Sequence, residues 1–187
     1  MRKDFGKQTV LYPMPVLIIA TYDENGNANV MNAAWGGIHD TNQIGICIDP
    51  SHKTAKNLEL KKAFTVSFAD AAHVKECDYV GIVSGNDVSD KLKNAGFTVT
   101  KSENVDAPII NELPLCLECE LVSYDSQTGC TVANIINVSA DEKILTDGKV
   151  DPAKLEPITY DPVNHNYIKL GAIVGKAFSD GKALSSL

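Results

Sequence analysis

The sequence predicts a mainly β fold with short helices, an antiparallel barrel that carries its helices on the outside. Short apolar segments rich in β-branched residues arrive at regular intervals, and turn residues separate them. The dipeptide Asn25-Gly26 between two of these segments is a strong signal for a hairpin. The chain has 187 residues, 44% of them apolar, so we expect one domain, 1–187, with a substantial core.

The first third of the chain predicts four strands and one helix. Residues 16–22 (VLIIATY) form the first strand, and residues 28–35 (ANVMNAAW) return as its antiparallel partner. Residues 43–49 and 64–69 are the third and fourth strands, because both are rich in β-branched or aromatic residues. Between them, "TAKNLELKKA" predicts a helix, and Thr54 is placed to cap it.

The middle of the chain predicts two short helices and two long strands. Both helices fall within residues 70–96, and a polar loop at 84–87 separates them. Gly96 follows the second helix, where a glycine commonly ends one. Residues 114–124 and 130–145 are the long strands, on either side of the turn "DSQTG". The last third is loop-rich and interrupted by prolines.

Composition disfavours two classes of protein. The 17 basic and 24 acidic residues give a net charge of −7, which argues against a nucleic-acid binder with its basic surface. The longest apolar run, Pro13 to Ala20, is far shorter than the roughly 20 residues that a bilayer requires. The N-terminus lacks the layout of a signal peptide. We therefore expect no nucleic-acid partner, no membrane and a cytoplasmic protein.

The five cysteines are expected as free thiols, because their number is odd and no secretion signal precedes them. Cys116 and Cys119 form a C-x-x-C motif, which a metal or redox site could use. In a strand, however, a spacing of three places the two side chains on opposite faces. No second Cys or His pair lies at zinc-ligand spacing, so buried strand cysteines are the favoured interpretation and no metal site is predicted.

The segment "DPSHKT" joins the end of a strand at Pro50 to the start of a helix near Thr54. The first turn of a helix offers unpaired N–H groups and the positive end of the helix dipole. Ser51 and Thr54 add hydroxyl groups and Lys53 adds a charge, so the segment is suited to hold a phosphate. A plain helix cap with a solvated lysine fits the same spacing equally well.

The strand "NVMNAAW" has an unusual composition. Asn32, Ala33 and Ala34 place an amide and two small side chains before Trp35, the only tryptophan. Small side chains allow a flat ligand to approach the main chain. The alternative is an alanine-lined crossing of a helix over the barrel, with Trp35 in the core.

The segment "SGNDVSDK" collects polar residues around a glycine and ends at Asp90-Lys91, in the first turn of a predicted helix. One interpretation is a loop that folds over a ligand, with Lys91 aimed at it. The other is a connector between two helices whose charges face water.

Taken in order, four segments resemble the flavin reductase-like proteins of the flavoredoxin type. They are "PVLIIATYDENGNANVMNAAW", "IDPSHKTAKNLELKKAFTVSF", "CDYVGIVSGNDVSDKLKNAGF" and "PLCLECEL", and the resemblance runs from about Pro13 to Val138. It implies a split β-barrel, antiparallel and Greek-key-like, that binds FMN. It also implies a homodimer with its flavin sites near the subunit interface, which residues 151–167 are expected to reach across.

The resemblance also implies an FMN site. The "NAAW" strand would run along the isoalloxazine ring, and "SHKT" would hold the phosphate. "SGNDVSDK" is similar to the family's Ser-Gly-Arg…Asp-Lys loop, with Asn86 in place of the arginine. The expected FMN-binding residues are Met31, Asn32, Ala33, Ala34, Trp35, Ser51, His52, Lys53, Thr54, Ser84, Asp90 and Lys91.

The chemistry of such a protein belongs mainly to its cofactor, so no catalytic residue is expected. No Gly-x-Gly-x-x-Gly follows a strand, so NAD(P)H, if used, would stack on the flavin from an open cleft. The expected function is an NAD(P)H-dependent flavin or small-acceptor reductase. The alternatives are a non-catalytic carrier that exchanges electrons with a protein partner, and an acidic β-barrel binding module without flavin.

Overall fold

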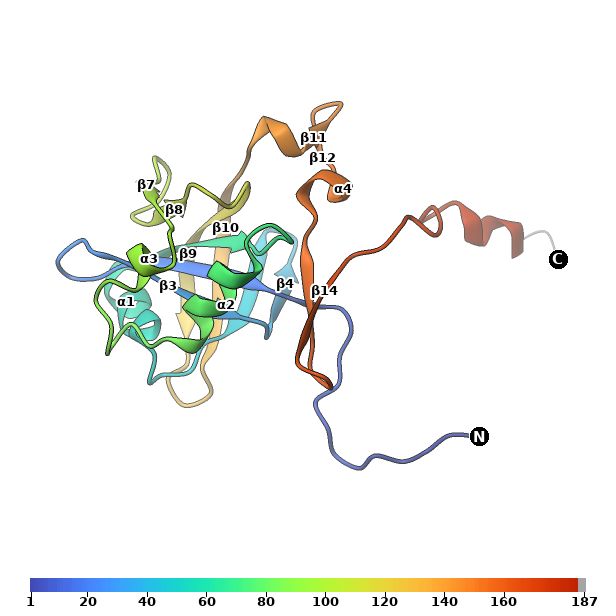
Figure 1. The fold of residues 1–187 in the computed structure, drawn as a ribbon, viewed down its shortest axis with the longest axis horizontal. Helices are drawn as coiled ribbons and strands as arrows, with labels where there is room; N and C mark the ends of the chain where they lie inside the picture. The colour runs from blue at the N-terminus through green and yellow to red at the C-terminus, as the bar shows by residue number, and fades with distance from the viewer. Residues whose placement is uncertain (185–187) are drawn as a thin grey trace.

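The computed structural model describes residues 1–184. A seven-stranded antiparallel sheet forms the body of the protein, in the order β3-β2-β6-β9-β10-β5-β4 (Figure 1). Its strands are β2 (Leu17–Tyr22), β3 (Ala28–Ala33), β4 (Gly36–Asp40), β5 (Gln43–Cys47), β6 (Ala63–Phe68), β9 (Leu115–Tyr124) and β10 (Cys130–Ala140).

The strands at the two edges of this sheet, β3 and β4, follow each other directly in the chain. β3 ends at Ala33 on one edge, and β4 begins at Gly36 on the other. Ala34 and Trp35 bridge them, and the N–H of Cys47 donates to the carbonyl of Trp35 at 2.8 Å. Within residues 1–184 no ladder joins β3 to β4, so the sheet curls into a barrel that is split between these strands. The expected strand 28–35 therefore stops at Ala33, because the chain leaves one edge to reach the other.

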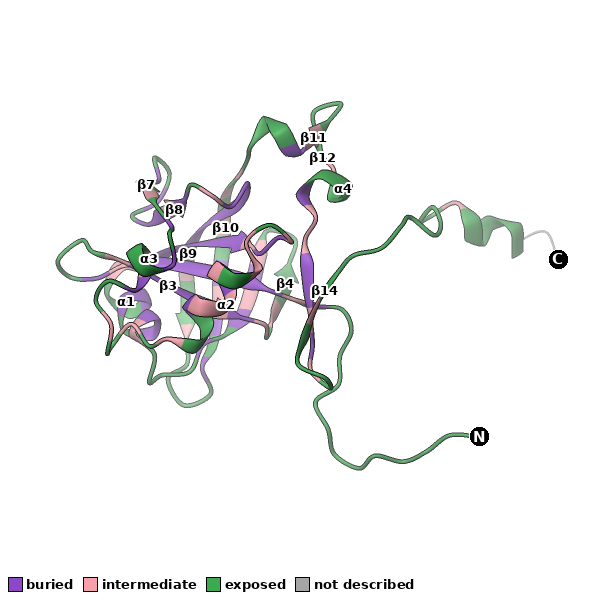
Figure 2. Cartoon of the chain, viewed as in Figure 1, coloured by how far each residue is buried: buried purple, intermediate pink, exposed green. Residues whose placement is uncertain are grey.

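Both faces of the sheet are covered, which explains the uninterrupted apolar run of β2. Leu17 and Ile19 belong to the cluster inside the curl. Ile18 and Ala20 alternate with them and belong to a second cluster on the outer face. Figure 2 shows the buried strands inside the body of the protein, away from the two exposed chain ends. A strand with one solvated face would instead alternate apolar and polar residues.

Three helices complete these two clusters. α1 (Lys53–Lys61) contributes Leu58 to the inner cluster, and α2 (Val74–Ile82) contributes Val80 to the outer one. α3 (Lys91–Asn94) follows the loop after α2. The predicted pair of short helices within residues 70–96 is thereby confirmed.

The predicted hairpin turn at Gly26 and the predicted helix end at Gly96 are also confirmed. Gly26 has a φ of 79° in the turn between β2 and β3, and the carboxylate of Asp23 accepts from the N–H groups of Asn25 and Asn27. Gly96 has a φ of 76° and follows Ala95, the C-cap residue of α3. Both glycines adopt a left-handed conformation that other residues rarely tolerate.

The region after β10 differs from the prediction. The expected strand 130–145 ends at Ala140, because the Asp141 side chain accepts from the N–H of Lys143 and starts a 3-10 turn. A second sheet, β1-β13-β14, packs beside the body. The remaining elements are β1 (Met14–Pro15), β7 (Val99–Lys101), β8 (Pro108–Ile110), η1 (Glu142–Ile144), β11 (Leu145–Thr146), β12 (Lys149–Val150), α4 (Pro152–Leu155), β13 (Ile158–Asp161), β14 (Asn166–Lys169) and η2 (Asp180–Leu184).

Both ends of the chain extend away from the body (Figure 1). Residues 1–11 are exposed, as are almost all residues of 170–184. Ile173 and Val174 are 95% and 101% exposed, so the apolar end of the chain covers nothing of its own core. No helix in the described part of the chain is long and apolar enough to cross a membrane.

The C-x-x-C cysteines are buried strand residues, as predicted. Cys116 is 2% exposed and Cys119 is 0% exposed, and both are free thiols. Cys119 belongs to the inner cluster. Among residues 1–184 no group of three or more metal-ligating side chains comes together.

Candidate binding site

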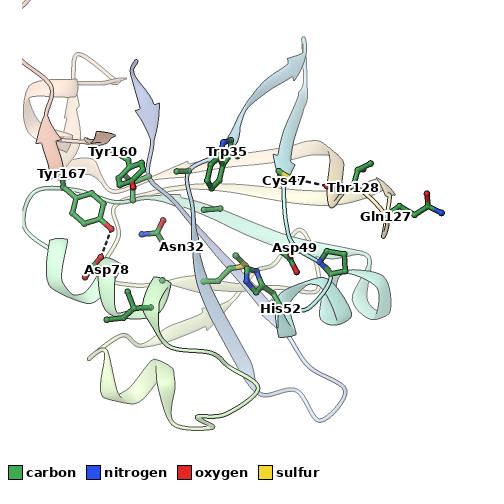
Figure 3. A pocket seen from close by; sticks show the side chains of 17 residues that line it. Asn32, Trp35, Cys47, Asp49, His52, Asp78, Gln127, Thr128, Tyr160 and Tyr167 are labelled. Carbon is green, nitrogen blue, oxygen red and sulfur yellow. Dashed lines mark hydrogen bonds between the residues drawn. The ribbon is translucent and has the colours of Figure 1, made fainter. Parts of the chain in front are cut away.

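A cavity of about 640 Å³ lies where the chain crosses from β3 to β4. Figure 3 shows Tyr160, Tyr167 and Asp78 on one side, Cys47 and Thr128 on the other, and Trp35 between them. The sequence-predicted residues that line it are Met31, Asn32, Ala33, Ala34, Trp35 and His52.

A smaller hollow of about 200 Å³ adjoins this cavity. The two share Met31, Asn32, His52, Gly81 and Ile82 in their walls. The smaller hollow is closed by the start of α1, the end of α2 and the loop after α2. Its further sequence-predicted residues are Lys53, Thr54, Ser84 and Lys91. Together the two spaces provide a site with a wide part and a narrow part.

Lys91 is the most unusual residue of the narrow part. It is only 5% exposed, and burial lowers the pKa of its ammonium to about 8. Within residues 1–184 this ammonium has neither a hydrogen bond nor an ion pair. A buried cation without a counter-ion is unfavourable unless an anion joins it. The narrow hollow is therefore suited to an anionic group.

The start of α1 supplies further donors to the same hollow. The helix begins at Lys53, and His52 takes the N-cap position without a side-chain cap bond. The prediction that Thr54 caps the helix is wrong, because Thr54 lies inside the first turn. In the described chain the N–H groups of Lys53 and Thr54 have no hydrogen-bond partner, as is usual for a first turn without a cap. They add to the positive end of the helix dipole.

Thr54 has a hydrogen-bond partner in β3, and Lys53 has an ion-pair partner in the turn between β2 and β3. Thr54 is 1% exposed, and its oxygen accepts from Asn29 Nδ2 at 2.8 Å, which leaves its hydroxyl hydrogen available. Lys53 Nζ lies 3.1 Å from Asp23 Oδ2. Burial raises the pKa of Asp23, but hydrogen bonds from Asn27 and Lys53 outweigh it and lower the pKa. Lys53 is thus an ion-paired residue, not the solvated lysine of the alternative interpretation.

The loop after α2 is fastened over the start of α1. Asn86 Nδ2 donates to the carbonyl of Ser51 at 3.0 Å, and the N–H of Asn86 donates to Ser84 Oγ at 3.1 Å. A Cβ at Gly85 would lie 2.1 Å from Asn29 Oδ1, so only glycine allows this approach. Asn86, which replaces the arginine of the family's loop, therefore holds the loop in place by a neutral hydrogen bond.

Two sequence-predicted site residues do not line either space. Ser51 is exposed, and its hydroxyl donates to Asp49 Oδ1 at 2.6 Å. Asp90 is exposed at the N-cap of α3 and makes no side-chain cap bond. Ser51 was expected as a hydroxyl donor, but Asp49 takes up its hydroxyl. The Asp90 side chain is left to solvent.

Trp35 lies at the cavity and not in the core. Its side chain is 60% exposed, which makes the core alternative wrong. Ala33 beside it is 8% exposed. Asn32 is tied to α2, because its Nδ2 donates to the carbonyl of Cys77 at 3.1 Å. A flat surface of small side chains therefore ends at an accessible indole.

Sequence reasoning missed one wall of the cavity. The β13–β14 hairpin places Tyr160 and Tyr167 there, with ring centroids 6.2 Å apart. The Tyr167 hydroxyl donates to Asp78 Oδ1 at 2.8 Å. The pKa of Tyr167 is raised, mainly by burial and secondly by its hydrogen bond to the Asp78 carboxylate. The alternation in "ITYD" and "NYIK" was the available signal, but the prolines around it predicted loops.

The fold and the two adjoining spaces define a split-barrel protein with a wide cavity, lined by small and aromatic side chains, and a narrow hollow that includes two lysines in its walls. Residues 9–160 match the model of the Flavin reductase like domain, and the chain belongs to that family. It is similar to the flavoredoxin of Desulfovibrio vulgaris (Miyazaki F), with 35% identity, 97% of this chain and 100% of that chain covered, and a TM-score of 0.92.

Two further solved structures share the fold. The flavoredoxin from Methanosarcina acetivorans is 31% identical, with 98% of this chain and 100% of that chain covered and a TM-score of 0.89. The FMN-binding domain of a flavin reductases-like enzyme from Shewanella baltica OS155 is 22% identical, with 87% and 88% covered and a TM-score of 0.78. The antiparallel split barrel expected from the sequence is thereby confirmed.

Proposed function

We propose that this protein binds FMN and transfers electrons through it. The observation that carries the proposal is the buried, unpaired ammonium of Lys91 in a narrow hollow beside a wide cavity. The phosphate would occupy the hollow and the isoalloxazine ring the cavity. The FMN-binding protein from Shewanella baltica that shares this fold supports the choice of ligand.

The residues of the narrow hollow fit a phosphate. A phosphate monoester carries between one and two negative charges near neutral pH. The Lys91 ammonium, the Thr54 hydroxyl and the N–H groups of Lys53 and Thr54 would hold it. The three residues that carry these donors line one hollow of about 200 Å³, which is small enough to favour a single terminal phosphate.

The residues of the wide cavity fit a flat ring. Ala33 and Ala34 leave space beside the main chain, and Trp35 offers an aromatic surface at the rim. The bound flavin would supply the redox chemistry, since it accepts a hydride or single electrons. The part of the protein is to orient the ring and to exclude water from one side of it.

Ligand titrations test this proposal. The protein freed of ligand should bind FMN more tightly than riboflavin, which lacks the phosphate, and more tightly than FAD, which extends beyond it. The purified protein should also show the absorption bands of flavin. Riboflavin bound as tightly as FMN would contradict the assignment of the hollow, and a protein that binds none of the three would favour a binding module without flavin.

For the source of electrons, we propose NAD(P)H and a reductase that passes them to a flavin or another small acceptor. The exposed Trp35 at the rim leaves the cavity open to a nicotinamide ring. A second candidate is an electron carrier with a protein partner, which the likeness to two flavoredoxins favours. Rapid anaerobic reduction by NADH or NADPH would support the reductase. Reduction only by another redox protein would support the carrier.

We also propose a homodimer. The exposed apolar side chains of Ile38 on β4 and of Ile173 and Phe178 at the chain end would be covered by a second copy. Residues 151–167 pack on their own chain through the β1–β13 ladder, so the extended ends 1–11 and 170–184 are better placed to reach a partner. Light scattering should give about twice the 20.1 kDa of one chain. The cytoplasmic location stays a prediction from the sequence.

A further inference from the structure

Cys47 and Cys130 are direct partners across two antiparallel strands. Cys47 ends β5, Cys130 begins β10, and their Cα atoms face each other in the ladder. The N–H of Ile48 donates to the carbonyl of Gly129 at 2.8 Å, which makes Cys47 and Cys130 a non-hydrogen-bonded pair. In such a pair the Cα atoms are about 4.5 Å apart and the side chains share a face. This lies within the range of about 4.4–6.8 Å that a disulfide requires.

These two cysteines differ from the other three in accessibility. Both are exposed, whereas Cys77, Cys116 and Cys119 are buried. Burial raises the pKa of Cys77 and of Cys119 to about 12 and the pKa of Cys116 to about 11. The buried thiols therefore stay protonated and out of reach, and only the thiolate form is a nucleophile.

The pair also contacts the cavity wall. Cys47 lines the wide cavity, and its thiol donates to the carbonyl of Thr128 at 3.5 Å. The hydroxyl of Thr128 accepts from the N–H of Cys130 at 3.3 Å, and Thr128 lines the cavity too. Loss of the Cys47 thiol hydrogen would remove one of the contacts between the 125–129 turn and the end of β5; the hydrogen bond from Ile48 to Gly129 would remain.

We propose that Cys47 and Cys130 form a reversible dithiol–disulfide site on the cavity wall, which small disulfides oxidise. The thiolate of one cysteine attacks a sulfur of the external disulfide and releases one thiol. The thiolate of the other then attacks the mixed disulfide and releases the second thiol. The protein gives up two hydrogens and the external disulfide takes them up, so the products are a Cys47–Cys130 disulfide and two small thiols.

Treatment of the folded full-length protein with oxidised glutathione tests the proposal. The chain should lose the mass of two hydrogen atoms, and peptide mapping should find Cys47 linked to Cys130. The three buried cysteines should take up an alkylating reagent only after unfolding. Dithiothreitol should restore both exposed thiols, because an accessible disulfide between closely spaced strands is readily reduced. None of these readouts requires FMN.

Two serine variants sharpen the experiment. Cys47→Ser and Cys130→Ser each leave one exposed thiol without a partner, so each should stop at a stable glutathione adduct that the wild type resolves. Exposed cysteines change to serine with little loss of stability, so both variants should fold. A wild-type protein that also stops at the adduct, or a disulfide that includes a buried cysteine, would overturn the proposal.

Discussion

The proposed phosphate contact would offset the cost of burying the Lys91 ammonium. This ammonium is 5% exposed and, in the part of the chain that the structure describes, has no counter-ion. Such a group weakens the folded state and strengthens the binding of an anion. A lysine kept only for stability would show the opposite effect when removed. The two roles can therefore be separated by one substitution.

Lys91→Met should lower the affinity for FMN about tenfold to a hundredfold, because a charge-assisted hydrogen bond is lost. Riboflavin affinity should stay the same. The free energy of unfolding of the ligand-free variant should rise, on the order of 1–3 kcal/mol, since a buried charge is removed. Fluorescence titration and denaturant unfolding measure these changes. The control is Lys93→Met, at an exposed lysine two residues further on. An equal loss of riboflavin binding would contradict a phosphate contact.

The lowered pKa of Lys91 also predicts a pH dependence. Below about pH 8 the Lys91 ammonium is charged; as the pH rises through about 8 this charge is lost, and the affinity for FMN should fall with it. The stability of the ligand-free protein should rise between about 8 and the ordinary value of 10.5, because there the unfolded chain holds the proton more strongly. A decline in riboflavin affinity of the same size would argue against Lys91 as the titrating group.

Trp35 provides a direct optical test of the wide cavity. It is the only tryptophan, and it is 60% exposed at the rim. Bound FMN should quench its fluorescence, and removal of FMN should restore it. Trp35→Ala should weaken FMN binding but change the free energy of unfolding by only about 0.5 kcal/mol, as for other surface positions. Identical fluorescence with and without FMN would place the flavin elsewhere.

At the scale of the elements, the position of the loop after α2 depends on the close approach of Gly85 to the Asn29 side chain. Gly85→Ala would place a Cβ 2.1 Å from Asn29 Oδ1, and Asn29 is itself fixed by Thr54. The loop must then move away from the narrow hollow, so we expect FMN affinity to fall about tenfold or more. Gly37→Ala is the matched control, because nothing lies within 4 Å of its added Cβ. Unchanged FMN binding in Gly85→Ala would mean that the loop does not close the site.

The same elements explain how far the sequence could predict the fold and the site. Strands buried on both faces, such as β2, have strong apolar patterns, and Gly26 and Gly96 have conformations that only a few residues adopt. The sequence predicts a start of α1 that is too late, because Thr54 is a good cap residue and its burial against Asn29 depends on a distant strand. The β13–β14 hairpin was missed, since its strands are short and its partner, β1, is about 145 residues away in the chain.

At the scale of the whole molecule, the extended end of the chain should serve assembly and not folding. A variant that ends at Lys169 loses side chains such as Val174 and Phe178, which are 101% and 98% exposed. It should unfold as cooperatively as the full chain, while its mass in light scattering falls from about twice the chain mass to about one chain. A truncated chain that remains a dimer would assign the interface to the barrel itself.

The split in the barrel has a consequence for the order of events after synthesis. β3 pairs with β2 and β4 pairs with β5 in local hairpins, but the ladders of β6 with β9 and of β5 with β10 join distant parts of the chain. Non-local ladders form late in folding, because their loops must close first. The cavity at Ala34 and Trp35 is therefore complete only when those ladders have formed, because residues of distant segments also line it. Binding of the proposed cofactor should therefore follow folding. A ligand that binds only the folded barrel would shift the equilibrium from partly folded chains to the folded state.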